Sequence, residues 1–445
     1  MSILRRQLFF LWLALLPFGY QLSAYTGFTE PDKLIAPALL LIGFFSSIQS
    51  PLWRLNRLIF FTVISAALIV IKNLSFLGSS ELFEKLMWDD MVKIGYFVIP
   101  ILCIDSIATF RKSAWIVVFI AIVGCMSAFM VSIGLIRLPV GIPEEFRLGI
   151  QWLPKAKGLF LSTGNLVQYV TFASAWAILA PGITQARQPR VRAARWILAA
   201  AVVMGLLGTQ SRNLALALLV GLAVLWSIRK VEPLSGERRA LFAIGITAVV
   251  IPIIGIILAF PSEVIDVLAG LGGESARNAA TSRLHQYAVA WEVIGNHPLL
   301  GADPETYRNL GPTLDHIHNT WLLLLAHGGM VSAIIFFLLM ARSFLGVRKL
   351  SHAAEMTKEA AVVTAYFASM LVSIMFYVGM DKMFWALFGI ATAITCIEPL
   401  TKGSTTDGIS HKIPQSVAAT PKRVIPRAQS NRVRERKTAG TNFDP

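Results

Sequence analysis

The chain has 445 residues, of which 55% are hydrophobic and 15% are charged, and its mean hydropathy is +0.64. Soluble globular domains carry about 25% charged residues, so this composition excludes an ordinary soluble domain and indicates a polytopic membrane protein. The formal net charge is +15. The basic residues recur in short groups between apolar runs instead of forming one patch, which disfavours nucleic acid as a partner and is typical of membrane loops.

Twelve apolar runs approach the ~20 residues that a helix needs to cross the hydrocarbon of a bilayer. We therefore predict an all-α polytopic integral membrane protein with about 12 transmembrane helices and both ends on one side. The membrane domain should cover residues 1–400. The predicted spans are 8–25, 33–50, 58–76, 92–108, 114–136, 159–181, 194–209, 212–228, 240–260, 320–341, 361–379 and 383–399.

The positions of lysine and arginine predict the orientation of these spans. Cytoplasmic loops of membrane proteins are rich in Lys and Arg. In this chain, every second predicted loop is rich in these residues. Those loops would be cytoplasmic, together with both termini. They contain Arg5, Arg6, Arg54, Arg57, Arg111, Lys112, Arg187, Arg190, Arg192, Arg195, Arg229, Lys230, Arg238, Arg239, Arg342, Arg348, Lys349 and Lys358.

The opposite, outer loops are poorer in positive charge and contain Glu30, Asp32, Glu81, Glu84, Asp89 and Asp90. One of them departs from the pattern, because the segment 137–158 carries Arg137, Arg147, Lys155 and Lys157. Either the rule, which is statistical, fails here, or these cations bind an acidic group on the outer side.

The second long outer segment, 261–319, lies between the ninth and tenth spans and is long enough to contain structure of its own. From Ser282 to Asn296 apolar residues recur at helical spacing, which predicts an amphipathic helix on the outer face. Arg283 and Gln286 would form its polar face, and Asn296-His297-Pro298 would end it. The apolar positions are Leu284, Tyr287, Ala288, Trp291 and Ile294, with Trp291 as an interfacial anchor.

The last segment, 401–445, is rich in Gly, Ser, Thr and Pro with scattered Lys and Arg, and it lacks apolar periodicity. We predict a disordered, basic cytoplasmic tail. It would either contact anionic lipid headgroups or remain solvated.

Few residues in the chain are suited to cofactor or metal chemistry. Cys103, Cys125 and Cys396 all fall in apolar runs, which favours small buried side chains over a disulfide or zinc framework. There is no Walker lysine loop, no dinucleotide glycine fingerprint and no HExxH motif. We therefore expect no cofactor and no ATP coupling within this chain.

The strongest candidate site is the polar segment Asp315-His316-Ile317-His318-Asn319, directly before the tenth span. Histidines two residues apart face the same way in extended chain, so His316 and His318 can address one site. Acid–base or substrate contact, a structural role and metal binding all remain open. Ionisable groups at a membrane boundary are functional candidates by default.

Two arginines are further candidates on the outer side. Arg212 follows Gly208-Thr209-Gln210-Ser211, a polar break between the seventh and eighth spans, and Arg283 begins the predicted surface helix. A guanidinium binds phosphate through its planar, permanently charged fork. The alternatives are a snorkelling side chain for Arg212 and a solvated helix-face charge for Arg283.

Taken together, these motifs resemble the O-antigen ligase/polymerase superfamily in order and spacing, over about residues 150–345. The resemblance rests on several degenerate motifs that are fairly specific in combination. They are Gly158-Leu159-Phe160 with Gly164-Asn165, Ser211-Arg212, Arg283 with Trp291, His297-Pro298-Leu299-Leu300-Gly301, His318-Asn319 and Gly328-Gly329.

The resemblance implies a metal-independent membrane glycosyltransferase of the bacterial inner membrane, with its active site on the periplasmic side. The donor would be a glycan on undecaprenyl diphosphate. The acceptor would be lipid A–core in a ligase, the favoured alternative, or another lipid-linked glycan in a polymerase. His318 would be the general base, Arg212 and Arg283 would clamp the diphosphate, and Asn319 would position substrate.

In one respect the chain departs from the family pattern. Family members often place an arginine just before the Gly-Leu-Phe motif, whereas this chain has Lys155 and Lys157 there and Arg147 further upstream. Lys157 and Arg147, like His316, are therefore candidate substrate contacts. A non-enzymatic transporter is a second class of function, but it should carry ionisable residues at mid-span, and most predicted spans carry none.

Overall fold

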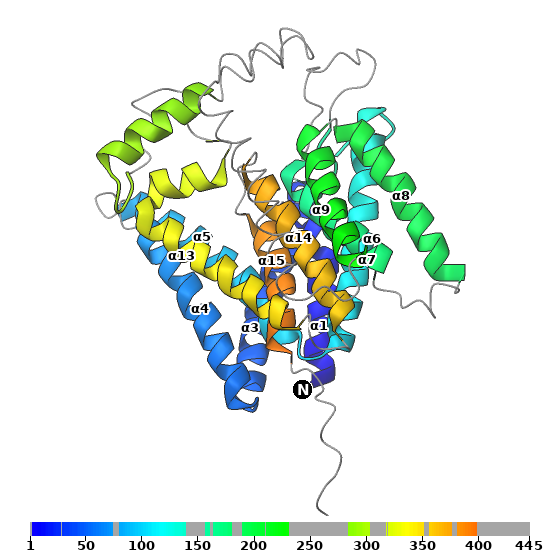
Figure 1. The fold of residues 1–445 in the computed structure, drawn as a ribbon, viewed down its shortest axis with the longest axis horizontal. Helices are drawn as coiled ribbons and strands as arrows, with labels where there is room; N and C mark the ends of the chain where they lie inside the picture. The colour runs from blue at the N-terminus through cyan, green and yellow to red at the C-terminus, as the bar shows by residue number, and fades with distance from the viewer. Residues whose placement is uncertain are drawn as a thin grey trace, which may run out of the picture. The chain divides into compact units, whose positions relative to one another are not determined.

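The computed structural model describes residues 2–27, 29–73, 80–138, 156–160, 163–179, 189–209, 211–230, 284–302, 317, 319–350, 356–375 and 381–397. These parts are helical and contain no strand (Figure 1). The helices are α1 (Ser2–Leu15), the 3₁₀ turn η1 (Leu16–Phe18), α2 (Gly19–Thr26), α3 (Pro31–Ile48), α4 (Leu52–Lys72), α5 (Ser80–Cys103), α6 (Ile107–Ser132), α7 (Thr163–Leu179), α8 (Pro189–Thr209), α9 (Arg212–Lys230), a surface helix (residues 284–296), α13 (Thr320–Leu350), α14 (Thr357–Met375), α15 (Lys382–Ala393) and the 3₁₀ turn η4 (Ile394–Cys396).

The predicted fold class is confirmed: the chain is an all-α polytopic membrane protein. Six described helices are long and apolar enough to cross a membrane, and three shorter apolar helices accompany them. Every predicted span but one overlaps a described helix. The exception, 240–260, lies outside the described residues, as does the tail 401–445. The total of twelve spans therefore stays a prediction.

Several predicted boundaries were wrong, and the largest error concerns the fourth span. The range 92–108 runs across a turn, because α5 ends at Cys103 and α6 begins at Ile107. The Ser106 side chain caps α6 by accepting a hydrogen bond from the Thr109 backbone N–H at 3.3 Å. Hydropathy did not show this turn because both of its flanks are apolar, whereas a cap is a local hydrogen-bonding feature.

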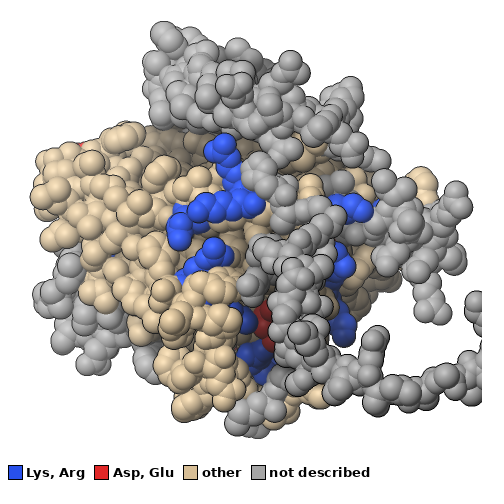
Figure 2. Space-filling model, turned by 60° about the horizontal axis from the view of Figure 1, so that its bottom comes forward, with Lys and Arg blue, Asp and Glu red and all other residues tan. Residues whose placement is uncertain are grey.

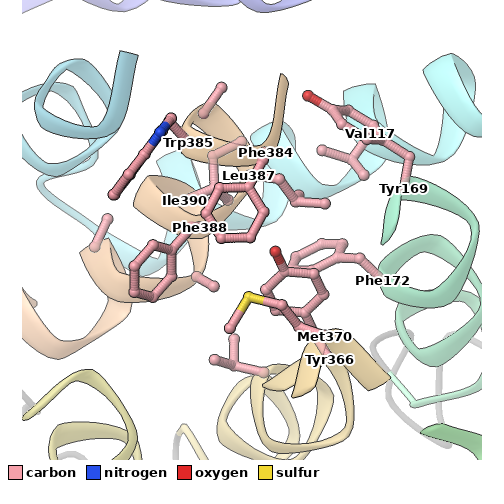
Figure 3. Close-up of a cluster of buried hydrophobic side chains, with 14 of the residues drawn as sticks. Val117, Tyr169, Phe172, Tyr366, Met370, Phe384, Trp385, Leu387, Phe388 and Ile390 are labelled. Carbon is pink, nitrogen blue, oxygen red and sulfur yellow. The ribbon is translucent and has the colours of Figure 1, made fainter. Parts of the chain in front are cut away.

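The short helix α15 lies at the centre of the bundle, and all its residues are buried. It packs mainly on α5 and also contacts α7 and α13. Figure 3 shows its Phe384 and Leu387 side chains in one apolar cluster with Phe172 of α7 and Tyr366 of α14. A helix that is apolar on every side belongs in a core or in lipid, and here other helices of the same chain surround it.

The remaining helices form pairs around this centre, with α6 against α7 and α8, α14 against α7 and α9, and α4 against α13. The three cysteines are buried and unbonded, as predicted. Cys125 of α6 packs against Gly205 of α8, where a Cβ atom would come within 2.5 Å of its Sγ. The thiol therefore serves as a small apolar surface at a close helix contact.

One end of the bundle, which we call the basic end, contains residues 2–6, 49–57, 104–112, 350 and 356–359. Lys and Arg side chains gather on this face (Figure 2). Arg5 and Arg6 both bind Asp105, and Arg111 binds Glu359 at 2.7 Å. The grouping agrees with the sequence prediction that the basic loops share one side of the membrane.

Candidate functional site

The other end of the bundle, which we call the site end, contains residues 27, 29–30, 156–160, 208–209, 211–212, 317, 319–320 and 381–382. It includes the described candidates Lys157 and Asn319 and the first residue of α9, Arg212. The side chain of Arg212 lies outside the described part of the structure, as do His316, His318, Arg283 and Arg147 entirely. The structure therefore describes the helices and backbone segments next to these residues.

Lys157 and the start of α9 are held close together by backbone contacts. The backbone N–H of Ala156 donates to the carbonyl oxygen of Gly208, at the end of α8, with a distance of 2.9 Å. Four residues later Arg212 begins α9, whose first turn is capped by the Ser211 hydroxyl. Lys157 and Arg212 are 55 positions apart in sequence, yet the backbone segments next to them are hydrogen-bonded to each other at the site end.

The Gly-Leu-Phe motif supplies the anchor for this arrangement. Gly158 has φ of +63°, and a Cβ atom there would lie 2.6 Å from the backbone nitrogen of Ala128 in α6. The next N–H, of Leu159, donates to the Ser127 hydroxyl at 3.0 Å. Only glycine tolerates both the positive φ and the close backbone approach. The motif therefore packs the Lys157 segment closely against α6. This close packing explains why glycine is needed at position 158, without any catalytic role.

The surface helix was predicted correctly in position, and its described part covers residues 284–296. Its backbone ends where predicted, with His297 N–H bonded to Val293 O at 2.8 Å before the proline. The predicted faces were wrong in one respect. Gln286, expected on the polar outer face, is buried with only 6% of its surface exposed. The helix packs sideways against the start of α13, so its burial depends on a tertiary contact.

This contact forms a small second core, separate from that of the bundle. It contains Val289, Ala290, Val293, Ala302, Ile317, Leu322 and Ala326. Ile317 is fully buried in it, and Asn319 begins α13 by accepting hydrogen bonds from Trp321 N–H and Leu322 N–H at 2.9 and 3.1 Å. Both chain neighbours of residue 318 are therefore fixed. Asn319 has a capping role that the sequence prediction, which made it a substrate contact, did not include.

The Gly328-Gly329 pair produces a sharp kink in α13. Gly329 has φ of 64° and ψ of −170°, a conformation open essentially only to glycine. The part of α13 before the kink runs at a steep angle to the rest (Figure 1). Residues 330–350 then give a span of about 31 Å, close to the hydrocarbon thickness of a bilayer. The predicted span 320–341 begins with α13 but ends too early, because the helix continues to Leu350.

The segment after the surface helix bridges this kink. Met330 N–H donates to Pro298 O at 2.8 Å, beyond the kink, and Ala302 N–H donates to Ala326 O at 2.8 Å, before it. A Cβ atom on Gly329 would collide with the carbonyl group of Leu299. The His-Pro-Leu-Leu-Gly and Gly-Gly motifs thus form one braced unit that holds the start of α13 at its angle.

We expect Gly329→Ala to break this brace. The substitution would cost about 1–3 kcal/mol in backbone strain alone, and relief of the collision would shift the start of α13. A displacement of about 1 Å at a reacting group can lower turnover by roughly 10²-fold. The measurement is the glycan transfer that the family resemblance implies, assayed with the purified variant. Gly295→Ala is the matched control, because nothing lies within 4 Å of a Cβ there and activity should persist. Full activity of Gly329→Ala would show that the angle of this segment does not matter.

A buried charge cluster at the site end was not anticipated from the sequence. The Lys382 ammonium, at the start of α15, binds both Glu30 and Asp32 at the start of α3, the latter at 2.8 Å. Tyr96 of α5 donates its hydroxyl to Asp32 at 2.5 Å, and the ammonium also lies 4.1 Å from the ring centre of Tyr20. These side chains join α2, α3, α5 and α15 at one point.

Burial and charge oppose each other at Glu30, which lies just before α3. Burial acts to raise the pKa of its carboxyl, but hydrogen bonds and charge from Lys33 and Lys382 outweigh it and leave the pKa below its usual value. Glu30 is therefore ionised at neutral pH. The sequence prediction assigned Glu30 and Asp32 to an outer loop and did not pair them with Lys382, which directly precedes the twelfth predicted span.

A neighbouring contact extends this cluster toward the Lys157 segment. Asp381 caps α15 through the Met383 and Phe384 N–H groups at 3.0 and 3.1 Å, and it also accepts a hydrogen bond from Asn165 in the first turn of α7. Removal from water raises the pKa of Asp381 above its usual value despite these bonds. The Gly164-Asn165 motif thus attaches α7 to α15. Among the described residues, no group of three or more His, Cys, Asp or Glu side chains is suited to hold a metal.

The fold and the site end define the class: a polytopic helical membrane protein whose polar, cation-bearing segments are anchored at one end of the bundle. Residues 197–337 match the family described as O-antigen ligase. This match, which covers less than half of the chain, supports the resemblance to the O-antigen ligase superfamily. No curated protein matches the chain.

Proposed function

We propose that the protein transfers a glycan from undecaprenyl diphosphate to an acceptor sugar hydroxyl, most plausibly as a ligase acting on lipid A–core. The family match carries this proposal, because it supports an O-antigen ligase/polymerase-type activity and its range, 197–337, includes Arg212, Arg283 and His318. The three residues that the sequence assigns to chemistry thus all fall within the matched region. Lys157 and Arg147 precede it.

The reaction breaks the bond between the anomeric carbon of the donor and the diphosphate oxygen. A new bond forms between that carbon and the acceptor oxygen, and the proton of the acceptor hydroxyl passes to His318. The diphosphate leaves with its bonding electron pair, and Arg212 and Arg283 stabilise the charge that it gains. A positioned general base contributes roughly 10²–10⁴-fold to such a step. Neither a metal nor a nucleotide sugar takes part in this proposal.

The polymerase alternative uses the same donor and differs only in the acceptor. A strain lacking the protein distinguishes the two when its surface glycans are separated on a gel. Loss of glycan from lipid A–core, with long lipid-linked chains retained, indicates a ligase. Products with a single repeat unit indicate a polymerase. Unchanged glycans of both kinds would contradict the proposed function.

The positions of three buried charges, Glu30, Asp32 and Lys382, favour an enzyme over a transporter. A transporter should place ionisable side chains at mid-span along a path. Here Glu30 and Asp32 lie at the start of α3, and Lys382 is the first residue of α15. In this proposal the catalytic residues act at the same end of the bundle as these three charges. In this proposal the site end faces the periplasm and the basic end faces the cytoplasm.

We expect Arg212→Ala to lower transfer by roughly 10²–10³-fold, the loss typical of removing one group that stabilises a developing anion. Arg212→Lys should recover only part of this loss, because lysine keeps the charge but lacks the planar fork. The measurement is the turnover number of the purified protein with a lipid-linked donor.

The matched control for this pair is Arg195→Ala. Arg195 donates to the carbonyl oxygen of Ala177 at 2.6 Å near the start of α8, at the other end of that helix from Gly208. Its loss should leave turnover within a factor of about 2, because this partly buried side chain lies away from the site end. Equal activity of Arg212→Ala and the unmodified protein would remove Arg212 from the mechanism.

A further inference from the structure

The surface helix has three distinct sides. One side is buried in the second core and contains Gln286, Val289, Ala290 and Val293. With 100° per residue, Leu284, Tyr287, Ala288, Trp291 and Ile294 fall in a separate arc of about 120°. Within this apolar arc Ala288 and Trp291 are exposed, with 50% of the Trp291 surface accessible. The bundle therefore leaves the centre of an apolar arc uncovered.

The third side is polar and narrow. His285, Glu292 and Asn296 are all exposed and fall in an arc of about 40°, next to the apolar arc. A helix that only met water would not need to separate its exposed apolar and polar residues in this way. The separation is typical of a helix lying in the interface of a bilayer, with a tryptophan at the boundary.

The apolar arc also continues onto the membrane-crossing part of α13. Directly after the surface helix, Leu299 and Leu300 are 64% and 46% exposed. The carbonyl oxygen of Leu299 accepts a hydrogen bond from Val331 N–H, so this turn lies against α13 just beyond its kink. From there the exposed residues Met330, Ile334 and Phe337 follow along the span. A surface that begins as the lipid-facing side of a span thus extends up to the surface helix.

We propose that Trp291, Leu299 and Leu300 seat the surface helix in the lipid of the leaflet at the site end, at the boundary between headgroups and acyl chains. The partner is the bilayer itself, and the polar side with Glu292 faces water. On the proposed function, this seating holds the chain that follows Arg283 and the start of α13 at the height of a lipid-linked diphosphate. The kink at Gly329 fixes the start of α13, including its capping residue Asn319, relative to the surface helix.

Depth measurements on spin-labelled protein in nanodiscs test the seating directly. Single cysteines at Ala288, Leu300, His285 and Glu292 would each carry a nitroxide, after serine replaces the three buried native cysteines. The nanodiscs contain phosphatidylethanolamine and phosphatidylglycerol. We expect the labels at 288 and 300 to relax faster with oxygen, which concentrates in lipid. The labels at 285 and 292 should relax faster with a water-soluble nickel chelate.

Two results would overturn the proposal. If the labels at 288 and 300 respond to the nickel chelate like that at 292, this side faces water. If they respond to neither reagent, another segment of the chain or a second copy covers it. Because the readout is independent of catalysis, the seating can fail while glycan transfer is present, and the proposed function can fail while the seating holds.

A functional arm links the seating to the proposed reaction. Trp291→Glu should raise the KM for a membrane-embedded, lipid-linked donor by roughly tenfold, whereas Trp291→Phe should stay close to the unmodified protein. The turnover number should change less than KM, because the variant alters access and not the reacting groups. An unchanged KM for Trp291→Glu would show that substrate access does not depend on the seating.

Discussion

His318→Ala is expected to lower glycan transfer by roughly 10²–10⁴-fold, the usual contribution of a positioned general base. The variant should still fold and insert, because the anchors on both sides of residue 318 do not involve its side chain. Ile317 is fully buried in the second core, and Asn319 caps α13. The measurement is turnover by purified protein in lipid, with thermal unfolding as a check on folding.

His285→Ala is the matched control for this variant, because His285 is exposed on the polar side of the surface helix. Its activity should be unchanged. His316→Ala adds a further distinction, since a substrate contact should raise KM, whereas loss of the base should lower the turnover number. If His318→Ala transfers glycan at the normal rate, the proposed mechanism is wrong, whatever the effect of the two arginines.

Lys382→Met should be the most destabilising single substitution at the site end. It would leave the Glu30 and Asp32 carboxylates buried without their shared cation, and breaking a buried ion pair in this way costs about 3–5 kcal/mol. Only 4% of the Lys382 side chain is exposed, and Asp32 is fully buried, so water cannot replace the lost partner. The measurement is thermal unfolding of the detergent-solubilised protein.

Lys33→Met provides a close comparison, because Lys33 also binds Glu30, at 2.8 Å, but 43% of its side chain is exposed. An exposed pair contributes about 0–1 kcal/mol, so this variant should unfold almost normally. The triple variant Lys382→Met, Glu30→Gln, Asp32→Asn should recover much of the stability, since no uncompensated charge then remains buried. Equal unfolding temperatures for Lys382→Met and Lys33→Met would mean that water reaches the cluster.

The same cluster has a consequence for the candidate site. Asp381 directly precedes Lys382 and accepts a hydrogen bond from Asn165 at the start of α7. Asn165 in turn follows the Lys157 segment by a few residues. Loss of the cluster should therefore disturb transfer as well as stability. Because the triple variant keeps Asp381 and Asn165, recovery of its activity together with its stability would show that the ionic cluster acts on the site through position alone.

The sequence by itself determined the class of the protein, the order of its described spans and the position of the surface helix. Hydropathy and helical periodicity are local properties, readable within about twenty residues. The motifs that carry the family resemblance were also readable. Two of them, around Gly158 and Gly329, nevertheless turned out to be points of close backbone packing, because a glycine in a sequence does not show what it approaches.

The tertiary structure alone decided the remaining features. Lys382 and Asp32 are 350 positions apart, and no local pattern pairs them. Likewise, Gln286 is buried only because the surface helix packs sideways on α13, and that helix bends only because residues 298–302 brace it. In each case the conformation is set by contacts between residues that are distant in sequence. These contacts are an ion pair, a second hydrophobic core and the close packing of a carbonyl group against a glycine. Such contacts exist only once the chain has folded.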